Sequence, residues 1–296
     1  MINKSWRLFL PGLFFLLSCE KAVKFTLAQQ MPKLVVEATL EDSRYPLVYL
    51  TTSQDFFSRI SIQELSQSFV HDAEISITTG SYTQKLKEYS QQAENGYMFY
   101  YYTVDSLHEV QTFKGELGKS YSMKIVANGK EYTAATTIPM LAKQIKSLYF
   151  ETNVDKNDST KVALFARFTD PPGLGNYIRY FTKVNDKPFY PGLNSVYDDQ
   201  IIDGKSYNIQ IEQGVDRNNT IDVNNYAFFH KGDTITIKLC NIDKGVYEFW
   251  KTMEYSYSSI GNPFSSPTKV IGNINNGALG YFGGYAVQYS SIIIPE

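Results

Sequence analysis

The sequence predicts a mainly β protein: an immunoglobulin-like β-sandwich followed by a second β-rich domain that carries one packed α-helix. The first observation is composition, because the 296 residues include 23 tyrosines and 19 phenylalanines, and aromatic side chains favour strands. The second is that the apolar runs are short and bounded by Gly, Asn, Asp and Pro, as in sandwich domains. The third is a single stretch, near residues 243–257, with the apolar spacing of a helix.

The chain begins with the pattern of a secretory leader. Lys4 and Arg7 precede an apolar run, Leu8 to Leu17, and a small residue then leads to Cys19. The run is too short to span a bilayer, which takes roughly twenty apolar residues. Residues 1–18 are therefore expected to be a signal peptide of the lipoprotein type that is removed.

Cys19 is expected to become the lipid-bearing first residue of the mature protein. Two or more acyl chains hold a protein on a membrane almost permanently, whereas one chain holds it weakly. Residues 19–31, which continue with the polar pair Glu20-Lys21, are expected to form a tether between the lipid and the folded body. The predicted partner of this segment is thus the membrane.

Charge and cysteine content narrow the possibilities further. The formal net charge is −2, and loss of Lys4 and Arg7 with the leader makes the body more acidic. Because no basic stripe is available for a phosphate backbone, nucleic-acid binding is not expected. Cys240 has no partner for a disulfide once Cys19 is acylated, so it is predicted to be a small buried apolar residue.

The first domain, residues 32–139, is expected to contain several short strands around a polar excursion at residues 53–70. The predicted strands are Leu34–Ala38, Leu47–Leu50, Ala73–Thr78, Tyr97–Tyr102, Tyr121–Ala127 and Glu131–Thr137. Asn128-Gly129 separates the last two strands and is a strong hairpin signal. Pro139 stops the ladder because proline donates no backbone hydrogen bond.

One of these strands is an aromatic run whose alternate side chains point to opposite faces. The two sets are Tyr97, Phe99 and Tyr101 on one face, and Met98, Tyr100 and Tyr102 on the other. One face has to leave the core, so Tyr100 and Tyr102 are candidate contacts for a ligand such as a sugar. The alternative is an aromatic sheet face packed against its neighbours.

The second domain, residues 140–296, is expected to contain further strands and the helix. The predicted strands are Ile145–Phe150, Val162–Thr169, Tyr177–Val184, Tyr207–Glu212 and Thr234–Leu239. Asp243 is expected to cap the helix. The apolar positions of the helix fall on one stripe that should pack on the second sheet, and they are Val246, Phe249, Trp250, Met253 and Tyr257.

The stretch Gly261–Tyr285 combines six glycines with more apolar bulk than a solvated loop keeps. It is expected to be an ordered, partly buried loop with little regular structure until about Tyr281. Such a loop packs structurally or contacts a partner or ligand. Its candidate contact residues are Asn262, Phe264, Tyr281 and Phe282.

Several sequence strings together resemble one known family. They are Pro32–Glu37, Lys130–Ala134, Asp170–Arg179, Gly261–Pro267 and Gly277–Tyr285. The chain is similar over nearly its whole mature length to the Bacteroidota outer-membrane lipoprotein family known as domain of unknown function 4249. The resemblance implies an outer-membrane lipoprotein, of a kind often encoded beside TonB-dependent receptors. Glu20-Lys21 resembles, in a shorter form, the acidic and lysine signal that directs such lipoproteins to the cell surface.

The sequence does not contain a convergent catalytic set. His71, His108 and His230 are far apart and none has a metal-ligand spacing. Nucleophile elbows and phosphate-binding glycine loops are also missing. The acidic cluster Asp198, Asp199 and Asp203 is expected to be a solvated loop, so no enzyme activity, cofactor or metal site is predicted.

The sequence therefore favours a non-enzymatic, lipid-anchored outer-membrane protein that works with a TonB-dependent transporter, with the cell surface as a candidate location. Two alternatives from other classes remain open. One is a structural or adhesive surface module, because sandwich domains commonly serve as spacers. The other is a surface hydrolase acting on glycan or peptide, for which the compartment is the only support.

Overall fold

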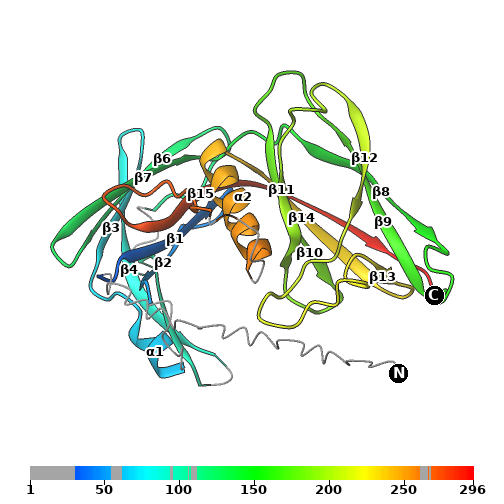
Figure 1. Cartoon of the computed structure of the whole chain (residues 1–296). Coiled ribbons are helices and arrows are strands. Elements are labelled where there is room, and N and C mark those ends of the chain that lie inside the picture. Colours follow the sequence, from blue (N-terminus) through cyan, green and yellow to red (C-terminus); the bar gives the residue numbers. More distant parts are fainter. Residues whose placement is uncertain are drawn as a thin grey trace, which may run out of the picture. The chain divides into compact units, whose positions relative to one another are not determined.

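The computed structural model describes residues 31–54, 62–93, 96–105, 107, 112–260, 266 and 268–296. Pro32–Glu296 form one compact unit and Met1–Met31 another. The predicted leader and the lipidation residue Cys19 lie outside the described residues. The fold is mainly β with one packed helix, which confirms the predicted fold class (Figure 1).

The part of the chain before residue 139 contains the six strands that the apolar runs predict and one further strand. Their bounds are β1 Leu34–Glu41, β2 Leu47–Thr52, β3 Glu74–Thr79, β4 Tyr82–Gln92, β5 Met98–Val104, β6 Ser120–Ala127 and β7 Lys130–Thr137. A short helix, α1 (Ile62–Gln67), lies within the predicted polar excursion. The predicted hairpin is confirmed, since β6 and β7 pair around Asn128 and Gly129, whose φ angles of 51° and 72° suit a tight turn.

The second part contains eight strands and the helix among its described residues. The strands are β8 Gln144–Thr152, β9 Lys161–Thr169, β10 Tyr177–Val184, β11 Tyr190–Tyr197, β12 Ser206–Ile211, β13 Phe229–His230, β14 Thr234–Ile242 and β15 Leu279–Ile293. Helix α2 spans Lys244–Ser259, and the side chain of Asp243 accepts a hydrogen bond from the Val246 amide at 2.9 Å. The predicted helix and its cap are confirmed.

The burial of α2 differs in part from the predicted stripe. Val246 and Phe249 are buried as expected, but Trp250 is half-buried and Tyr257 is 49% exposed. Glu254 is buried instead, because it contacts buried polar groups described below. The apolar stripe therefore covers the sheet only over the first half of the helix.

One long strand joins the two parts of the chain. The larger sheet has eleven strands in the order β11-β10-β14-β15-β1-β2-β5-β4-β3-β6-β7. Strand β15 runs parallel to β1 over Leu279–Tyr285 and antiparallel to β14 over Tyr285–Ile293. A smaller sheet of β8, β9, β12 and β13 forms a second layer. The division into domains at residue 139 stays a prediction, and β15 belongs to the pairing of both parts.

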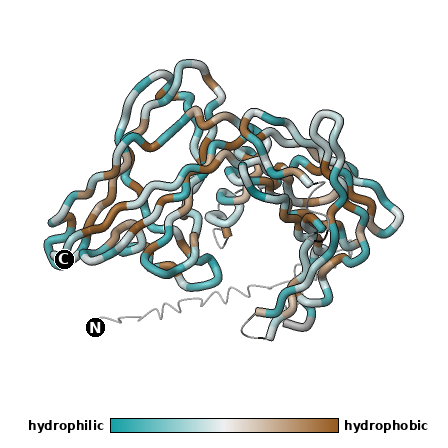
Figure 2. Tube along the Cα trace, turned by 180° about the vertical axis from the view of Figure 1, so that it is seen from behind, coloured by the Kyte–Doolittle hydropathy of each residue, from teal (hydrophilic) through white to brown (hydrophobic). Residues whose placement is uncertain are grey.

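The hydrophobic core has three clusters of buried residues. The first lies between the strands that precede residue 139 and includes Phe282 and Ala286 of β15. The second lies between the larger and smaller sheets and includes Ile237 of β14. The third lies between α2 and the opposite face of the larger sheet, where Cys240 is fully buried as predicted. Figure 2 shows hydrophobic positions within the strands and hydrophilic ones in many of the turns.

Three strands and one strand start differ from the sequence prediction, and one of these strands, β13, has only two residues and is too short to show a periodic pattern. Strand β4 was not predicted because its inward positions near the core are only Gln84 and Leu86, so it lacks apolar alternation. Strand β11 was not predicted because it contains Pro191 and Gly192. Regular structure was expected only from about Tyr281, and β15 begins two residues earlier, at Leu279, inside the glycine-rich motif.

Candidate functional site

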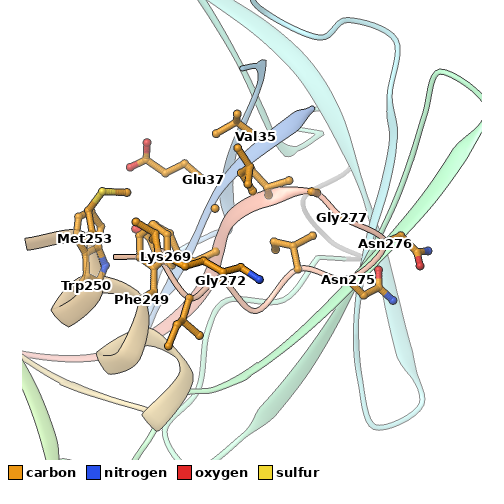
Figure 3. A pocket seen from close by; sticks show the side chains of 18 of the residues that line it. Val35, Glu37, Phe249, Trp250, Met253, Lys269, Gly272, Asn275, Asn276 and Gly277 are labelled. Carbon is orange, nitrogen blue, oxygen red and sulfur yellow. The ribbon is translucent and has the colours of Figure 1, made fainter. Parts of the chain in front are cut away.

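A pocket of about 860 Å³ lies beside α2, lined by residues that the structure describes. Three walls line it. The first is α2, the second is the pair of neighbouring strands β1 and β15, and the third is the segment 269–279. Figure 3 shows Trp250 and Met253 on one side and Asn275, Asn276 and Gly277 on the other. Its walls are mostly apolar and aromatic, as in sites that bind small molecules.

The floor of the pocket is formed by β15, whose glycines let its backbone pack closely against neighbouring atoms. A Cβ on Gly280 would stand 1.9 Å from the carbonyl oxygen of Val36, and the φ of Gly280 is +98°. A Cβ on Gly283 would stand 2.9 Å from the rings of Tyr281 and Tyr285. The glycines of this motif therefore serve close packing, and they bring the Tyr281 ring beneath α2.

Aromatic rings join α2 to this floor. The rings of Phe249 and Tyr281 are stacked with centroids 4.5 Å apart, and Trp250 meets Tyr281 edge-on at 5.3 Å. Trp250 Nε1 donates a hydrogen bond to Tyr285 Oη at 3.2 Å. These contacts fix the ring of Trp250 in the pocket wall.

A buried polar network supports Trp250 from behind. The guanidinium carbon of Arg179 lies 3.4 Å from the centroid of the Trp250 ring, and Arg179 Nε donates to Ser195 Oγ at 3.1 Å. The Ser195 amide and hydroxyl in turn donate to the Glu254 carboxylate, at 3.0 and 2.5 Å. Burial raises the pKa of Glu254, although the Ser195 hydrogen bonds and nearby guanidinium groups oppose it. Arg179 and Glu254 therefore both have a polar partner, because Ser195 hydrogen-bonds to each of them.

Asparagine side chains anchor the third wall, the segment 269–279, to β15 and to the edge of β7. Asn273 accepts from the Phe282 amide and donates to the Phe282 carbonyl, both at 2.8 Å. Asn275 accepts from the Thr133 amide at 2.6 Å, and Asn276 Nδ2 donates to the Glu131 carbonyl at 2.7 Å. Because side chains and backbone both anchor this segment, the pocket is preformed.

Glu37 is the one carboxylate among the residues that line the pocket. It lies on β1 between Tyr281 of β15 and Tyr49 of β2, which are its register partners. Its carboxylate has no hydrogen bond or ion pair with any residue that the structure describes. Surrounding protein atoms displace water and raise the pKa of Glu37, while the charge of Arg179 opposes this. The side chain is nevertheless exposed, since it faces the open pocket.

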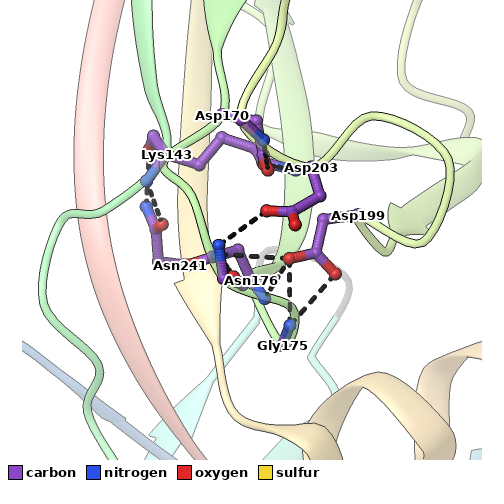
Figure 4. A network of polar contacts seen from close by, with 9 residues as sticks. Lys143, Asp170, Gly175, Asn176, Asp199, Asp203 and Asn241 are labelled. Atoms are coloured by element: carbon purple, nitrogen blue, oxygen red, sulfur yellow. Dashed lines mark hydrogen bonds and ion pairs between the residues drawn. The ribbon is translucent and has the colours of Figure 1, made fainter.

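A second polar cluster lies away from the pocket, around Asp170, Asp199 and Asp203 (Figure 4). One carboxylate oxygen of each lies within 4.8 Å of the others, a spacing that a cation could bridge. Lys143 Nζ, however, already stands 2.6 Å from Asp170 Oδ1, and both side chains are fully buried. The distance is that of an ion pair, although the angles are not those of an aligned hydrogen bond.

The motif Asp170–Arg179 wraps around this cluster. The amides of Gly175 and Asn176 donate to Asp199 at 2.9 Å each. Burial alone would raise the pKa of Asp199, but these hydrogen bonds outweigh it and lower the pKa. The expected solvated loop is therefore wrong for Asp199, which is 1% exposed. Asp203 is exposed, and Asp198 accepts from Tyr247 Oη at 2.8 Å.

The structure separates the predicted contact residues of the aromatic run. Tyr102 is 2% exposed, and its hydroxyl donates to the Val70 carbonyl at 2.8 Å, so it is a core residue and no ligand contact. Tyr100 packs edge-on against His71 with centroids 4.4 Å apart. The outward face carries Tyr101, which stacks on Tyr89 at 6.0 Å. The prediction of Tyr102 as a ligand contact is thus wrong, because the alternation does not say which face meets the core, whereas Tyr100 is half-buried and its contact role stays a prediction.

Of the predicted residues in the glycine-rich stretch, only one reaches the pocket among the described residues. Tyr281 lines it, although it is 3% exposed. Phe282 points the other way into the core and is fully buried, so its prediction as a contact is wrong. Asn262 and Phe264 lie outside the described residues.

Glu37 and Lys269 were not predicted as pocket residues. In the strand Leu34–Ala38, Glu37 stands at the polar position of an alternating pattern. That pattern signals an outward side chain and carries no information about a helix that lies over it. The covering helix comes from residues about 200 positions later in the chain, so only tertiary structure brings them together.

Among the described residues, the helices are too short or too polar to cross a bilayer. A comparison with curated proteins finds no match. The family model described as "Domain of unknown function (DUF4249)" matches residues 20–291. This match covers the pocket, all five sequence strings of the resemblance and the acidic cluster, and it confirms the family that these strings indicate. The chain belongs to the DUF4249 family.

Proposed function

We propose that this protein is a non-enzymatic binding component of the outer membrane, held there by lipid on Cys19, that captures a ligand in the pocket beside α2. The observation that carries the binding function is the pocket itself. It is large enough for a small organic molecule, its lining is apolar and aromatic, and hydrogen bonds hold its walls in place.

The membrane anchor rests on the leader pattern that ends at Cys19. A lipid on the first residue would keep the folded body at the membrane without a spanning helix. The partnership with a TonB-dependent receptor rests on the family resemblance. A tethered protein with a preformed pocket would raise the local concentration of a ligand beside such a transporter.

Replacing Cys19 with Ala tests the anchor. We expect the Cys19→Ala protein to leave the membrane fraction or to accumulate as an unprocessed precursor, because no acyl chain can be attached. Immunoblots of fractionated cells measure this, with Cys240→Ala as the control that keeps the anchor. A Cys19→Ala protein that fractionates with outer membrane at the wild-type level, and at the processed size, would contradict the anchor.

Affinity capture in mild detergent tests the partner. We expect the wild-type protein to co-purify a TonB-dependent receptor identified by mass spectrometry. Repeated capture of intact protein without such a receptor would count against the transport role and leave pocket binding to be judged separately.

A further inference from the structure

We propose that the ligand of this pocket is an organic cation: an ammonium group on an apolar body, with the ammonium received by Glu37. This inference rests on the proposed binding function and specifies its ligand. It starts from the unusual position of one carboxylate in an otherwise apolar and aromatic pocket.

Glu37 is placed to receive a positive charge from outside the chain. Its carboxylate faces the pocket without a hydrogen bond or ion pair to any described residue. The side chain is exposed to the open pocket, so a ligand can reach it, and the apolar walls beside it reduce the screening of its charge by water. Figure 3 shows Glu37 extending toward the side of Met253 and away from Asn275.

Aromatic rings lie on both sides of Glu37. Tyr281 and Tyr49 flank it on the neighbouring strands, and Trp250 meets the Tyr281 ring at 5.3 Å. The faces of aromatic rings attract cations, Trp most strongly. Here, however, Tyr281 is 3% exposed and stacks on Phe249, and Arg179 already lies over the Trp250 ring, so the rings supply mainly apolar surface and Glu37 supplies the attraction for an ammonium group.

The positive groups nearby do not satisfy Glu37. Arg179 is 4% exposed and is already occupied by the Trp250 ring and by Ser195, which links it to Glu254. Lys269 also lines the pocket and is exposed, but it forms no ion pair with Glu37. An anionic ligand could pair with Lys269, but it would be repelled by Glu37.

The apolar part of the ligand follows from the remaining walls. Met253 of α2, Val35 of β1 and Ile271 and Leu279 of the third wall all line the cavity. Burying an alkyl or aryl group against them is favourable by about 25 cal/mol per Å² of apolar surface. An ammonium group alone would leave most of the volume unfilled.

Trp250 allows a direct test, because it is the one tryptophan that remains when the leader is removed. Its fluorescence would be titrated with octylammonium, octanol and octanoate, using the mature protein in phosphatidylcholine vesicles. We expect octylammonium to bind wild-type protein at least about tenfold more tightly than octanol, a factor worth about 1.4 kcal/mol. In Glu37→Gln this preference should vanish while octanol binding is unchanged.

Glu151→Gln is the matched control, since Glu151 is an exposed carboxylate on β8 that does not line the pocket. It should keep the preference for octylammonium. Equal binding of octylammonium and octanol to wild-type protein would overturn the cation and leave pocket binding intact. Tightest binding of octanoate, lost in Lys269→Gln, would overturn it in favour of an anion. No response to any of the three probes would overturn the proposed binding function as well.

Discussion

At the scale of single residues, two pairs of buried charges among the described residues have partners of opposite sign close by. Lys143 lies against Asp170, and Arg179 is linked to Glu254 through Ser195. Removing one partner from such a pair leaves an uncompensated buried charge, which costs far more than the pair contributes. Glu37 differs from these groups because its carboxylate faces a pocket. This contrast is why it, and not the acidic cluster, is the candidate for ligand recognition.

Lys143→Met should show how strongly the acidic cluster depends on the lysine. We expect a loss of about 3–5 kcal/mol in the free energy of unfolding, because Asp170 would remain buried and charged without its partner. Urea denaturation followed by circular dichroism measures this loss. Adding Asp170→Asn to Lys143→Met should recover part of it, since the unpaired charge is then gone. A single variant within about 0.5 kcal/mol of wild type, the range of ordinary surface substitutions, would show that the pair is not structurally important.

At the scale of elements, the short apolar runs and the helix were predictable and the long last strand was not. Local periodicity and the Asp243 cap suffice for α2, and Asn128-Gly129 suffices for the β6–β7 hairpin. The start of β15 contains Gly280, Gly283 and Gly284, which locally favour a loop. Tertiary packing requires these glycines, because β1, α2 and β7 approach the backbone of β15 so closely that side chains would clash. The pocket was unpredictable for the same reason, since its walls come from three distant segments.

Two glycine-to-alanine substitutions separate close packing from ordinary glycine flexibility. Gly280→Ala should destabilise the protein by about 2–4 kcal/mol, because its positive φ is unfavourable for alanine and its Cβ would meet the Val36 carbonyl. Gly245→Ala, in the first turn of α2, should stabilise it by about 0.5–1 kcal/mol. A Cβ at Gly245 would make only ordinary contacts, the nearest at 3.5 Å. Thermal unfolding of both variants measures the difference, and equal effects would contradict the packing role of Gly280.

At the scale of the whole molecule, β15 couples two hydrophobic clusters. Phe282 and Ala286 on one part of the strand belong to the first cluster, and Ile292 packs against the second. The same strand pairs with β1 and with β14. Neither cluster can lose this strand without exposing apolar surface, so the folded body from Pro32 onward should unfold as one unit even though the sequence suggests two domains.

Calorimetry of variants in each cluster tests this coupling. Phe282→Ala in the first cluster and Ile237→Ala in the second should each cost about 2–5 kcal/mol, and a chain of this length shifts its Tm by roughly 2–4 °C per kcal/mol. Because β15 is shared, we expect each variant to lower the midpoint of the same single transition, with the calorimetric enthalpy equal to the van't Hoff enthalpy. Cys240→Ala, in the third cluster beneath α2, should shift that transition without splitting it. Two resolved transitions, with Phe282→Ala moving one and Ile237→Ala the other, would show that the two parts are independent domains that merely share a strand.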